Sequence, residues 1–221
     1  MNPRPVALVT GASRGLGREV ARRLAAEGFT VLAGMRRPVP MADAEVLPLD
    51  VTDEIGVLAA ADAVKIRYRR LDVLVNNAGV LLDDHLGVLD LDGETLRRTL
   101  ETNALGPLRM IRAFAPLMGP GARIVNVSSG GGQLSEPSTW APGYCISKTA
   151  LNAVTVQFAA ALKGRGITVN AVCPGWVRTD MGGPTAPRSL DQGADSILWP
   201  ILKAGPDVTG GFWRDGERIA W

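Results

Sequence analysis

A tyrosine and a lysine stand four positions apart in the segment YCISK, residues 144–148. On a helix, residues at this spacing lie on one face, so the phenol of Tyr144 and the ammonium of Lys148 would be neighbours. A tyrosine with an ordinary pKa of about 10 is a poor proton carrier at neutral pH, and a nearby positive charge favours its phenolate. The pair therefore permits a joint role in proton transfer, but ordinary amphipathic helices contain the same spacing, so the rest of the chain has to decide between the two.

A glycine-rich segment, TGASRGLG at residues 10–17, joins an apolar run to a helical pattern. Glycines let a backbone turn sharply and approach a bulky anion, and the start of the following helix offers free N–H groups and a positive dipole to a pyrophosphate. The spacing G-x-x-x-G-x-G differs from the general dinucleotide fingerprint G-x-G-x-x-G, and a glycine turn that serves only packing is the alternative. Its position after the first expected strand favours nucleotide binding.

Arginines occupy the region that selects between two nicotinamide cofactors. Proteins that bind NAD commonly place a carboxylate after the second strand for the ribose 2′-hydroxyl, whereas arginine accommodates a 2′-phosphate. Here Arg36 and Arg37 follow the second expected strand, and Arg14 lies in the glycine loop. Guanidinium groups bind phosphate in a bidentate manner, so the sequence predicts NADP(H) rather than NAD(H). Plain surface exposure is the alternative, and it applies most to Arg37.

Short apolar runs alternate with longer helical patterns along the chain, which is typical of a parallel sheet covered by helices on both faces. The sequence therefore predicts a doubly wound α/β Rossmann fold in a single domain, residues 1–221. The tail after Pro174 has no readable pattern, and Gly106-Pro107 should disturb the third helix. The expected strands are 5–11, 29–35, 45–51, 71–79, 122–129 and 167–175, and the expected helices are 14–27, 52–70, 92–118 and 144–163.

The composition excludes several classes of protein. Among 221 residues, 46% are apolar and 21% charged, as in ordinary globular proteins, and a net charge of +2 gives no reason to expect a nucleic-acid partner. We expect no signal peptide, no membrane-spanning segment and a cytoplasmic location. Two cysteines and one histidine cannot supply a usual zinc site. Cys145 is expected to pack in the interior, and His85 to lie in a loop.

Seven segments that follow one another along the chain resemble, in sequence and in order, the short-chain dehydrogenases/reductases in their common single-domain form. The tail segments WVRTDM and GGFWRDGERIAW look most like the NADPH-dependent carbonyl reductases of that family. The resemblance covers almost the whole chain and implies a hydride-transferring oxidoreductase. The segments are TGASRGLG (10–17), LDV (49–51), NNAG (76–79), Asn103, NVSS (126–129), YCISK (144–148) and PGWVRT (174–179).

The resemblance implies a role for each matching residue. Tyr144 would donate the proton, and Lys148 would favour the phenolate of Tyr144 and bind the nicotinamide ribose. Ser129 would bind the carbonyl oxygen, and Asn103 would orient a water. Asp50 would bind the adenine with Val51 beside it. The other cofactor contacts would be the glycine loop (Gly11, Ser13, Arg14, Gly15, Leu16, Gly17), the adenosine side (Asn77, Ala78, Gly79, with Arg36 and Arg37) and the nicotinamide side (Pro174, Gly175, Val177, Thr179).

Two departures from the family pattern matter. The interval from Ser129 to Tyr144, 144 − 129 = 15 positions, is slightly longer than usual, and the flexible loop between them can absorb the difference. This loop lacks the long insertion of monomeric animal carbonyl reductases, so a dimer or tetramer remains possible. Adjacent strand residues face opposite ways, and Ser128 is the fallback for the role given to Ser129.

The expected activity is NADPH-dependent reduction of a small or medium aldehyde or ketone. The alternatives are a dedicated biosynthetic ketoreductase, an alcohol dehydrogenase working oxidatively, or a non-catalytic dinucleotide sensor on the same fold. Four tryptophans could line the substrate site, and such an aromatic lining would suit an apolar carbonyl compound. Packing of these tryptophans in the core or at a subunit contact is equally compatible with the sequence. The tryptophans in question are Trp140, Trp176, Trp199 and Trp213.

Overall fold

The computed structural model describes residues 4–221, and its strands form one eight-stranded sheet in the order β3-β2-β1-β4-β5-β6-β7-β8. All neighbouring strands are parallel except β7 and β8. The strand order reverses between β1 and β4, the switch point where such sheets bind ligands. The strands are β1 (Val6–Thr10), β2 (Thr30–Met35), β3 (Glu45–Pro48), β4 (Val73–Asn76), β5 (Arg123–Val127), β6 (Thr168–Val172), β7 (Phe212–Arg214) and β8 (Glu217–Arg218).

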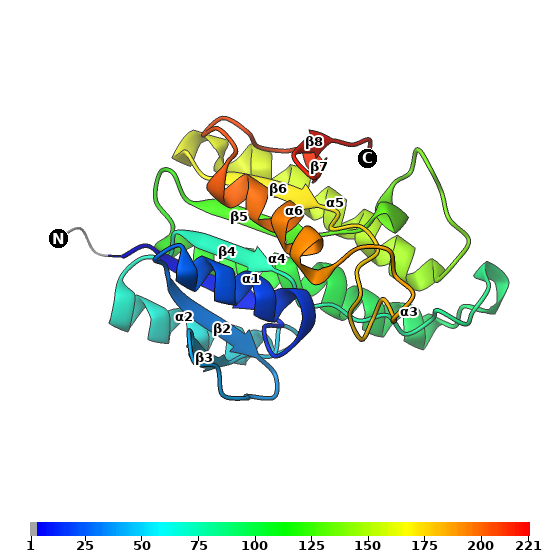
Figure 1. Cartoon of the computed structure of the whole chain (residues 1–221), viewed down its shortest axis with the longest axis horizontal. Coiled ribbons are helices and arrows are strands. Elements are labelled where there is room, and N and C mark those ends of the chain that lie inside the picture. The colour runs from blue at the N-terminus through cyan, green and yellow to red at the C-terminus, as the bar shows by residue number, and fades with distance from the viewer. Residues whose placement is uncertain (1–3) are drawn as a thin grey trace.

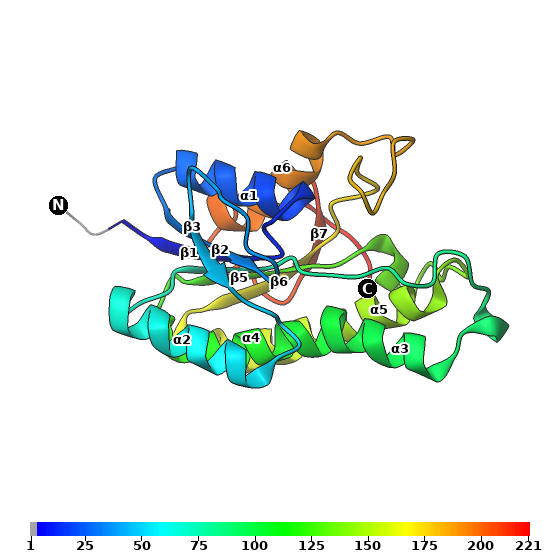
Figure 2. The same cartoon turned by 90° about the horizontal axis from the view of Figure 1, so that it is seen from below.

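Helices cover both faces of the sheet, as the sequence predicts for a doubly wound Rossmann fold. Seen from below, α1 (Gly15–Ala26) and α6 (Leu190–Leu202) lie on one side of the sheet (Figure 2). On the other side lie α2 (Glu54–Tyr68), α4 (Gly106–Phe114) and α5 (Pro142–Leu162), while α3 (Gly93–Leu100) continues the line of α4 beyond the strands (Figures 1 and 2).

Alternating strand residues build two separate cores. Leu8, Leu74 and Ile124 pack into the core shared with α2, α4 and α5. Their chain neighbours, such as Val9 and Val75, face α1 and α6 instead. Because both faces of these strands are buried, the strands are apolar throughout, which explains why they could be located from the sequence.

The helix expected at 92–118 is interrupted one turn earlier than predicted. A π-helical turn, Glu101–Leu105, separates α3 from α4, and the Gly106 amide donates to the Glu101 carbonyl. Pro107 then lies in the first turn of α4, where its missing N–H costs nothing. π-Bulges often occur at functional sites, and this one contains Asn103.

The tail after Pro174 contains α6, β7 and β8, which the sequence did not predict. The start of α6 carries a capping box, in which the Ser189 and Gln192 side chains bond each other's backbone. This S-x-x-Q spacing was a readable signal, but Pro200 inside the helix obscured the pattern that follows. β7 is only three residues long and depends on pairing with β6, so it has no local signature.

The expectation that no segment could span a membrane needs a qualification. The segment Pro142–Arg165, which includes α5, is long and apolar enough by length and composition alone. In the structure α5 packs along β6 and buries the polar residues Lys148, Asn152 and Thr155. A core helix that packs on a sheet satisfies the same composition test.

Candidate active site

The predicted site residues gather at the carboxyl ends of four parallel strands. The glycine loop follows β1, the segment 77–79 follows β4, Ser129 follows β5, and the segment 174–179 follows β6. Tyr144 and Lys148 come from the first turns of α5, and Asn103 from the π-helical turn. This edge includes the switch point between β1 and β4, where a doubly wound sheet opens a crevice for a ligand.

The backbone geometry of the glycine loop fits a dinucleotide. Gly11 and Gly15 have φ of +66° and +55°, a conformation that glycine adopts at little cost. A Cβ on Gly17 would lie 2.4 Å from the Gly11 carbonyl oxygen, so only glycine fits there. Arg14 caps α1 without a side-chain hydrogen bond, which leaves the first N–H groups of the helix available to an anion. Ser13 is half-buried, and Leu16 packs against the core.

The segment after β4 is joined to the glycine loop. The amides of Asn77 and Ala78 both donate to the Thr10 hydroxyl, at 3.0 Å. The Asn77 side chain donates to the carbonyls of Thr10 (2.9 Å) and Gly11 (3.3 Å). These bonds hold the segment after β4 against the start of the glycine loop.

The residues predicted to select the cofactor lie after β2, after β3 and in the glycine loop. Arg36 and Arg37 follow β2 directly and are exposed. Arg14 pairs with Asp180 at 2.6 Å, and both side chains are mostly exposed, so the ion pair is weak and open to exchange. The Asp50 carboxylate accepts from the Thr52 amide and hydroxyl, and Val51 is buried beside it.

The loop after β6 reaches across to the glycine loop. Gly175 has φ +77°, and a Cβ there would lie 2.4 Å from Arg188 Cδ, so the turn requires glycine. Arg188 is itself fixed by two bonds to Asp215, and this pair raises the pKa of Arg188 and lowers that of Asp215. Pro174 and Val177 are buried, and Thr179 approaches Gly15.

Tyr144 and Lys148 are brought together as the helix spacing predicts. The Lys148 ammonium nitrogen lies 5.5 Å from the centre of the Tyr144 ring and donates to the Val127 carbonyl at 2.8 Å. Burial lowers the pKa of Lys148 to about 8. Burial also raises the pKa of Tyr144 to about 12, while a hydrogen bond with Ser129 acts in the opposite direction. Both groups are therefore destabilised in their charged forms, which is typical of catalytic groups.

The two adjacent serines face opposite ways. Ser128 is buried, and its hydroxyl donates to Asn152 Oδ1 at 2.7 Å. Ser129 is half-buried and on the side of Tyr144, and its hydroxyl accepts from the Gly131 amide at 3.1 Å. The structure thus places Ser129, and not its fallback Ser128, next to the tyrosine.

Asn103 is buried and holds the chain just beyond Gly79. Its amide group exchanges two hydrogen bonds with the backbone of Val80, at 2.8 and 2.9 Å. It also donates to the Ser147 hydroxyl, which donates to the Tyr144 carbonyl. Ser147 was missed in the sequence, although it lies on α5 only three positions after Tyr144. The contacts link the π-helical turn to the helix of the tyrosine.

The tryptophans divide into two groups. Trp199 of α6 and Trp213 of β7 pack against each other, with ring centres 4.9 Å apart. Trp140 is 53% exposed, and its ring meets that of Tyr144 edge-on at 6.3 Å. Trp176 is 56% exposed in the loop after β6. Within residues 4–221, Trp140 is the only tryptophan whose ring packs against a predicted catalytic residue.

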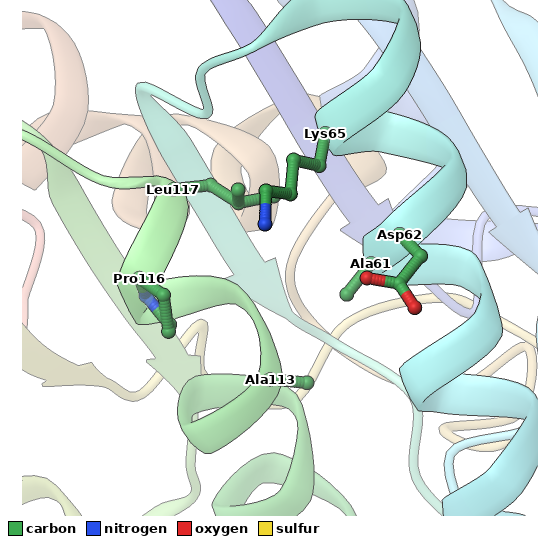
Figure 3. A pocket seen from close by; sticks show the side chains of 6 residues that line it. All are labelled: Ala61, Asp62, Lys65, Ala113, Pro116 and Leu117. Carbon is green, nitrogen blue, oxygen red and sulfur yellow. The ribbon is translucent and has the colours of Figure 1, made fainter.

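Other parts of the described chain contribute no competing site. Cys145 is buried, and its thiol donates to the Trp140 carbonyl. His85 lies exposed in a loop, and within residues 4–221 no three metal-binding side chains come together. A hollow between α2 and the end of α4 (Figure 3) lies near Leu71, before β4, away from the carboxyl edge. It is lined by Ala61, Asp62, Lys65, Ala113, Pro116 and Leu117.

Two curated relatives match almost the whole chain. (+)-Neomenthol dehydrogenase of Arabidopsis thaliana is 31% identical over 97% of this chain and 97% of its own length. Carbonyl reductase (NADPH) 1 of Sus scrofa is 30% identical over 98% of this chain and 94% of its own length. The second alignment spans 276 positions against 221 residues here, so that relative carries insertions.

Solved structures and a family model agree with these relatives. The NADPH-bound carbonyl reductase from chicken fatty liver superposes with a TM-score of 0.89 at 28% identity, covering 100% of both chains. A Burkholderia multivorans short-chain dehydrogenase/reductase with bound NADP gives 0.87 at 28% identity, covering 99% and 100%. The family model for short chain dehydrogenases matches residues 5–189. The chain therefore belongs to the short-chain dehydrogenase/reductase family of oxidoreductases and resembles its NADPH-dependent carbonyl reductases.

Proposed function

We propose that this protein is an NADPH-dependent carbonyl reductase that acts on small or medium aldehydes and ketones. The observation that carries the proposal is that Ser129, Tyr144 and Lys148 lie close together, at the same edge of the sheet as a glycine loop whose backbone suits a dinucleotide. The names of the pig and chicken relatives support the same activity. Since all strands of residues 4–221 share one sheet, we also propose that the chain acts as one domain.

The side chains divide the proton chemistry between them. NADPH, when bound, supplies the hydride for the carbonyl carbon. Tyr144 Oη then donates its proton to the carbonyl oxygen, and the Ser129 hydroxyl donates a hydrogen bond to that oxygen as negative charge grows. The positive charge of Lys148, whose ammonium nitrogen lies 5.5 Å from the centre of the Tyr144 ring, stabilises the phenolate that remains.

Asn103 and Gly79 shape the route by which the proton is replaced. A Cβ on Gly79 would lie 3.4 Å from Asn103 Oδ1 and 3.7 Å from the Lys148 ammonium nitrogen. Both polar atoms therefore lie near the same side of Gly79. A water there would bond both groups and return a proton to Tyr144 through Lys148.

The cofactor preference is tested by removing Arg36. We expect Arg36→Ala to raise the Kd of NADPH roughly tenfold and that of NADH less than about twofold, because only NADPH carries the 2′-phosphate that a guanidinium binds. Titration of each cofactor by protein fluorescence measures both constants. Arg112→Ala, which removes an exposed arginine on α4, is the control and should alter neither. An equal effect of Arg36→Ala on both cofactors would contradict the proposal.

The substrate class is tested at Trp140. Its exposed ring against Tyr144 offers an apolar wall for an aromatic or branched carbonyl compound. We expect Trp140→Ala to raise the KM for an aromatic ketone about tenfold and to alter the KM for a short aldehyde by less than about threefold. Trp199→Ala is the matched control, since its ring packs on Trp213 instead. Equal KM changes for the two substrates would exclude Trp140 from the substrate wall.

A panel of aldehydes, ketones and alcohols, each with NADPH and NADP as well as NADH and NAD, tests the proposed activity as a whole. A carbonyl reductase consumes NADPH with carbonyl compounds. Turnover confined to one ketone or to alcohol oxidation would favour a dedicated ketoreductase or an alcohol dehydrogenase. Binding of NADPH without any turnover would favour the sensor.

A further inference from the structure

A buried carboxylate lies at the start of the helix that carries Tyr144. Asp83 is 0% exposed and belongs to the loop after β4, about 60 positions before the helix. One of its oxygens accepts from the Gly143 amide at 2.5 Å. The Tyr144 amide approaches both oxygens, at 3.3 and 3.4 Å.

The first turn of α5 needs this external partner. Ala141, at the N-cap position, has no side-chain acceptor and adopts φ +47°, a left-handed conformation that is unfavourable for alanine. The first amides of a helix have no partner within the helix, and in α5 they belong to the buried Gly143 and the half-buried Tyr144. Asp83 therefore supplies from a distant loop the acceptor that an N-cap side chain usually supplies.

The helix also stabilises the carboxylate in return. Burying a charge is costly unless it is paired, yet within residues 4–221 no ion pair includes Asp83. The amides of the first turn and the positive end of the α5 dipole take the place of a cation. The fit is close, since a Cβ on Gly143 would lie 3.0 Å from the carboxylate. The start of the helix and Asp83 therefore form one unit.

The loop that carries Asp83 is also hydrogen-bonded to the predicted catalytic residue Asn103, near the point where the loop leaves β4. Asn103 bonds both backbone groups of Val80, three positions before Asp83. Asn103 also reaches Tyr144 through Ser147. The segment 79–83 thus bonds the first turn of the tyrosine's helix directly and is linked to its second turn through Asn103.

We infer that Asp83 is a positioning residue that fixes the first turn of α5, and with it Tyr144, relative to Ser129 and the segment after β4. The inference rests on the proposed function. Asp83 does not touch the reacting atoms and acts only through the amides of Gly143 and Tyr144. Its loss should therefore slow the chemical step and leave cofactor binding in place, because the glycine loop is untouched.

The test compares three variants of the whole protein with saturating NADPH and one active carbonyl compound. We expect Asp83→Ala to lower kcat by roughly 10- to 100-fold while the Kd of NADPH stays within about threefold. Asp83→Asn keeps one acceptor for the Gly143 amide and should recover kcat to within about threefold of the wild type. If Asp83→Ala does not fold, Asp83→Ser takes its place, because the serine side chain is too short for its oxygen to reach the amides.

Asp92→Ala is the matched control for lost stability. Asp92 caps α3 by accepting from the Thr95 amide at 2.8 Å, and it lies outside the proposed site. This variant should lower Tm by a few degrees with kcat unchanged. Three results would overturn the inference: kcat of Asp83→Ala within about twofold of the wild type, an equal loss of kcat in Asp92→Ala, or a loss of NADPH affinity as large as the loss of kcat.

Amide hydrogen exchange separates this inference from the proposed function. If the wild-type protein turns over no carbonyl compound, the proposed function fails, but the contact of Asp83 remains measurable. Asp83→Ala should then speed exchange at Gly143 and Tyr144 at least tenfold, with little change at the first turn of α3. Unchanged exchange at these two amides would overturn the role of Asp83 as well.

Discussion

Tyr144→Phe is expected to lower kcat for carbonyl reduction by roughly a thousandfold, within the usual range for loss of a general acid. Phenylalanine keeps the ring and its contact with Trp140 but has no proton to donate. The Kd of NADPH should stay within about threefold, because the substitution leaves the glycine loop and the other predicted cofactor contacts unchanged. Steady-state kinetics with saturating NADPH, together with a binding titration, measure both quantities.

The other tyrosine of the chain provides a matched control. Tyr68 lies on α2, and its hydroxyl bonds Glu45 at 2.5 Å, on a different part of the sheet. Tyr68→Phe should leave kcat unchanged and cost about 1 kcal/mol of stability through the lost hydrogen bond. If Tyr144→Phe retains more than about a tenth of the wild-type kcat, Tyr144 is not the proton donor.

Lys148→Met should move activity and stability in opposite directions. We expect kcat to fall about 100- to 1000-fold, because the charge that favours the phenolate is lost. Burial lowers the pKa of Lys148 from 10.5 to about 8, so the protonated lysine costs the folded state about 3 kcal/mol at neutral pH. Loss of the charged hydrogen bond to Val127 offsets about 2 kcal/mol, so the variant should gain about 1 kcal/mol without cofactor.

The pH dependence of this gain follows from the direction of the shift. Below the folded pKa of about 8, the lysine is protonated in both states and the full cost applies. Between about 8 and 10.5 the unfolded chain binds more protons than the folded protein, so the wild type becomes more stable as the pH rises. The advantage of Lys148→Met should therefore shrink across this window.

Denaturant unfolding of the cofactor-free proteins at about pH 7 and about pH 10 measures the advantage. Lys65→Met, at an exposed position on α2, should change stability little at either pH. A Lys148→Met variant that is less stable at neutral pH, or an advantage that grows with pH, would contradict the assignment of a charged, desolvated lysine.

The sequence predicted the part of the fold whose signals are local. Strands such as Val6–Thr10 and Arg123–Val127 are apolar on both faces, and this pattern is visible without any tertiary information. The glycine loop and the Tyr144–Lys148 pair were readable for the same reason, because turn chemistry and helix spacing are short-range. The family assignment, which rested on the order of seven such segments, is confirmed by the family model.

The features that the sequence could not supply depend on contacts between distant segments. Asp83 lies about 60 positions from the amides it binds, and nothing in its own neighbourhood points to α5. The close approach of Arg188 to Gly175, and the bonds between Arg188 and Asp215, likewise need the folded tail. The strand β7 exists only through its pairing with β6. Such features become visible only when the chain is folded.

Transfer of deuterium from the cofactor tests the proposed reaction most directly. The wild-type protein is supplied with NADPH that carries deuterium at the transferable position of C4, together with an aromatic ketone, and the alcohol is analysed by mass spectrometry. A carbonyl reductase should give an alcohol with one deuterium on the carbinol carbon, and Tyr144→Phe should give almost none over the same time. If NADPH binds but no labelled alcohol forms from any aldehyde or ketone, the protein is not a carbonyl reductase.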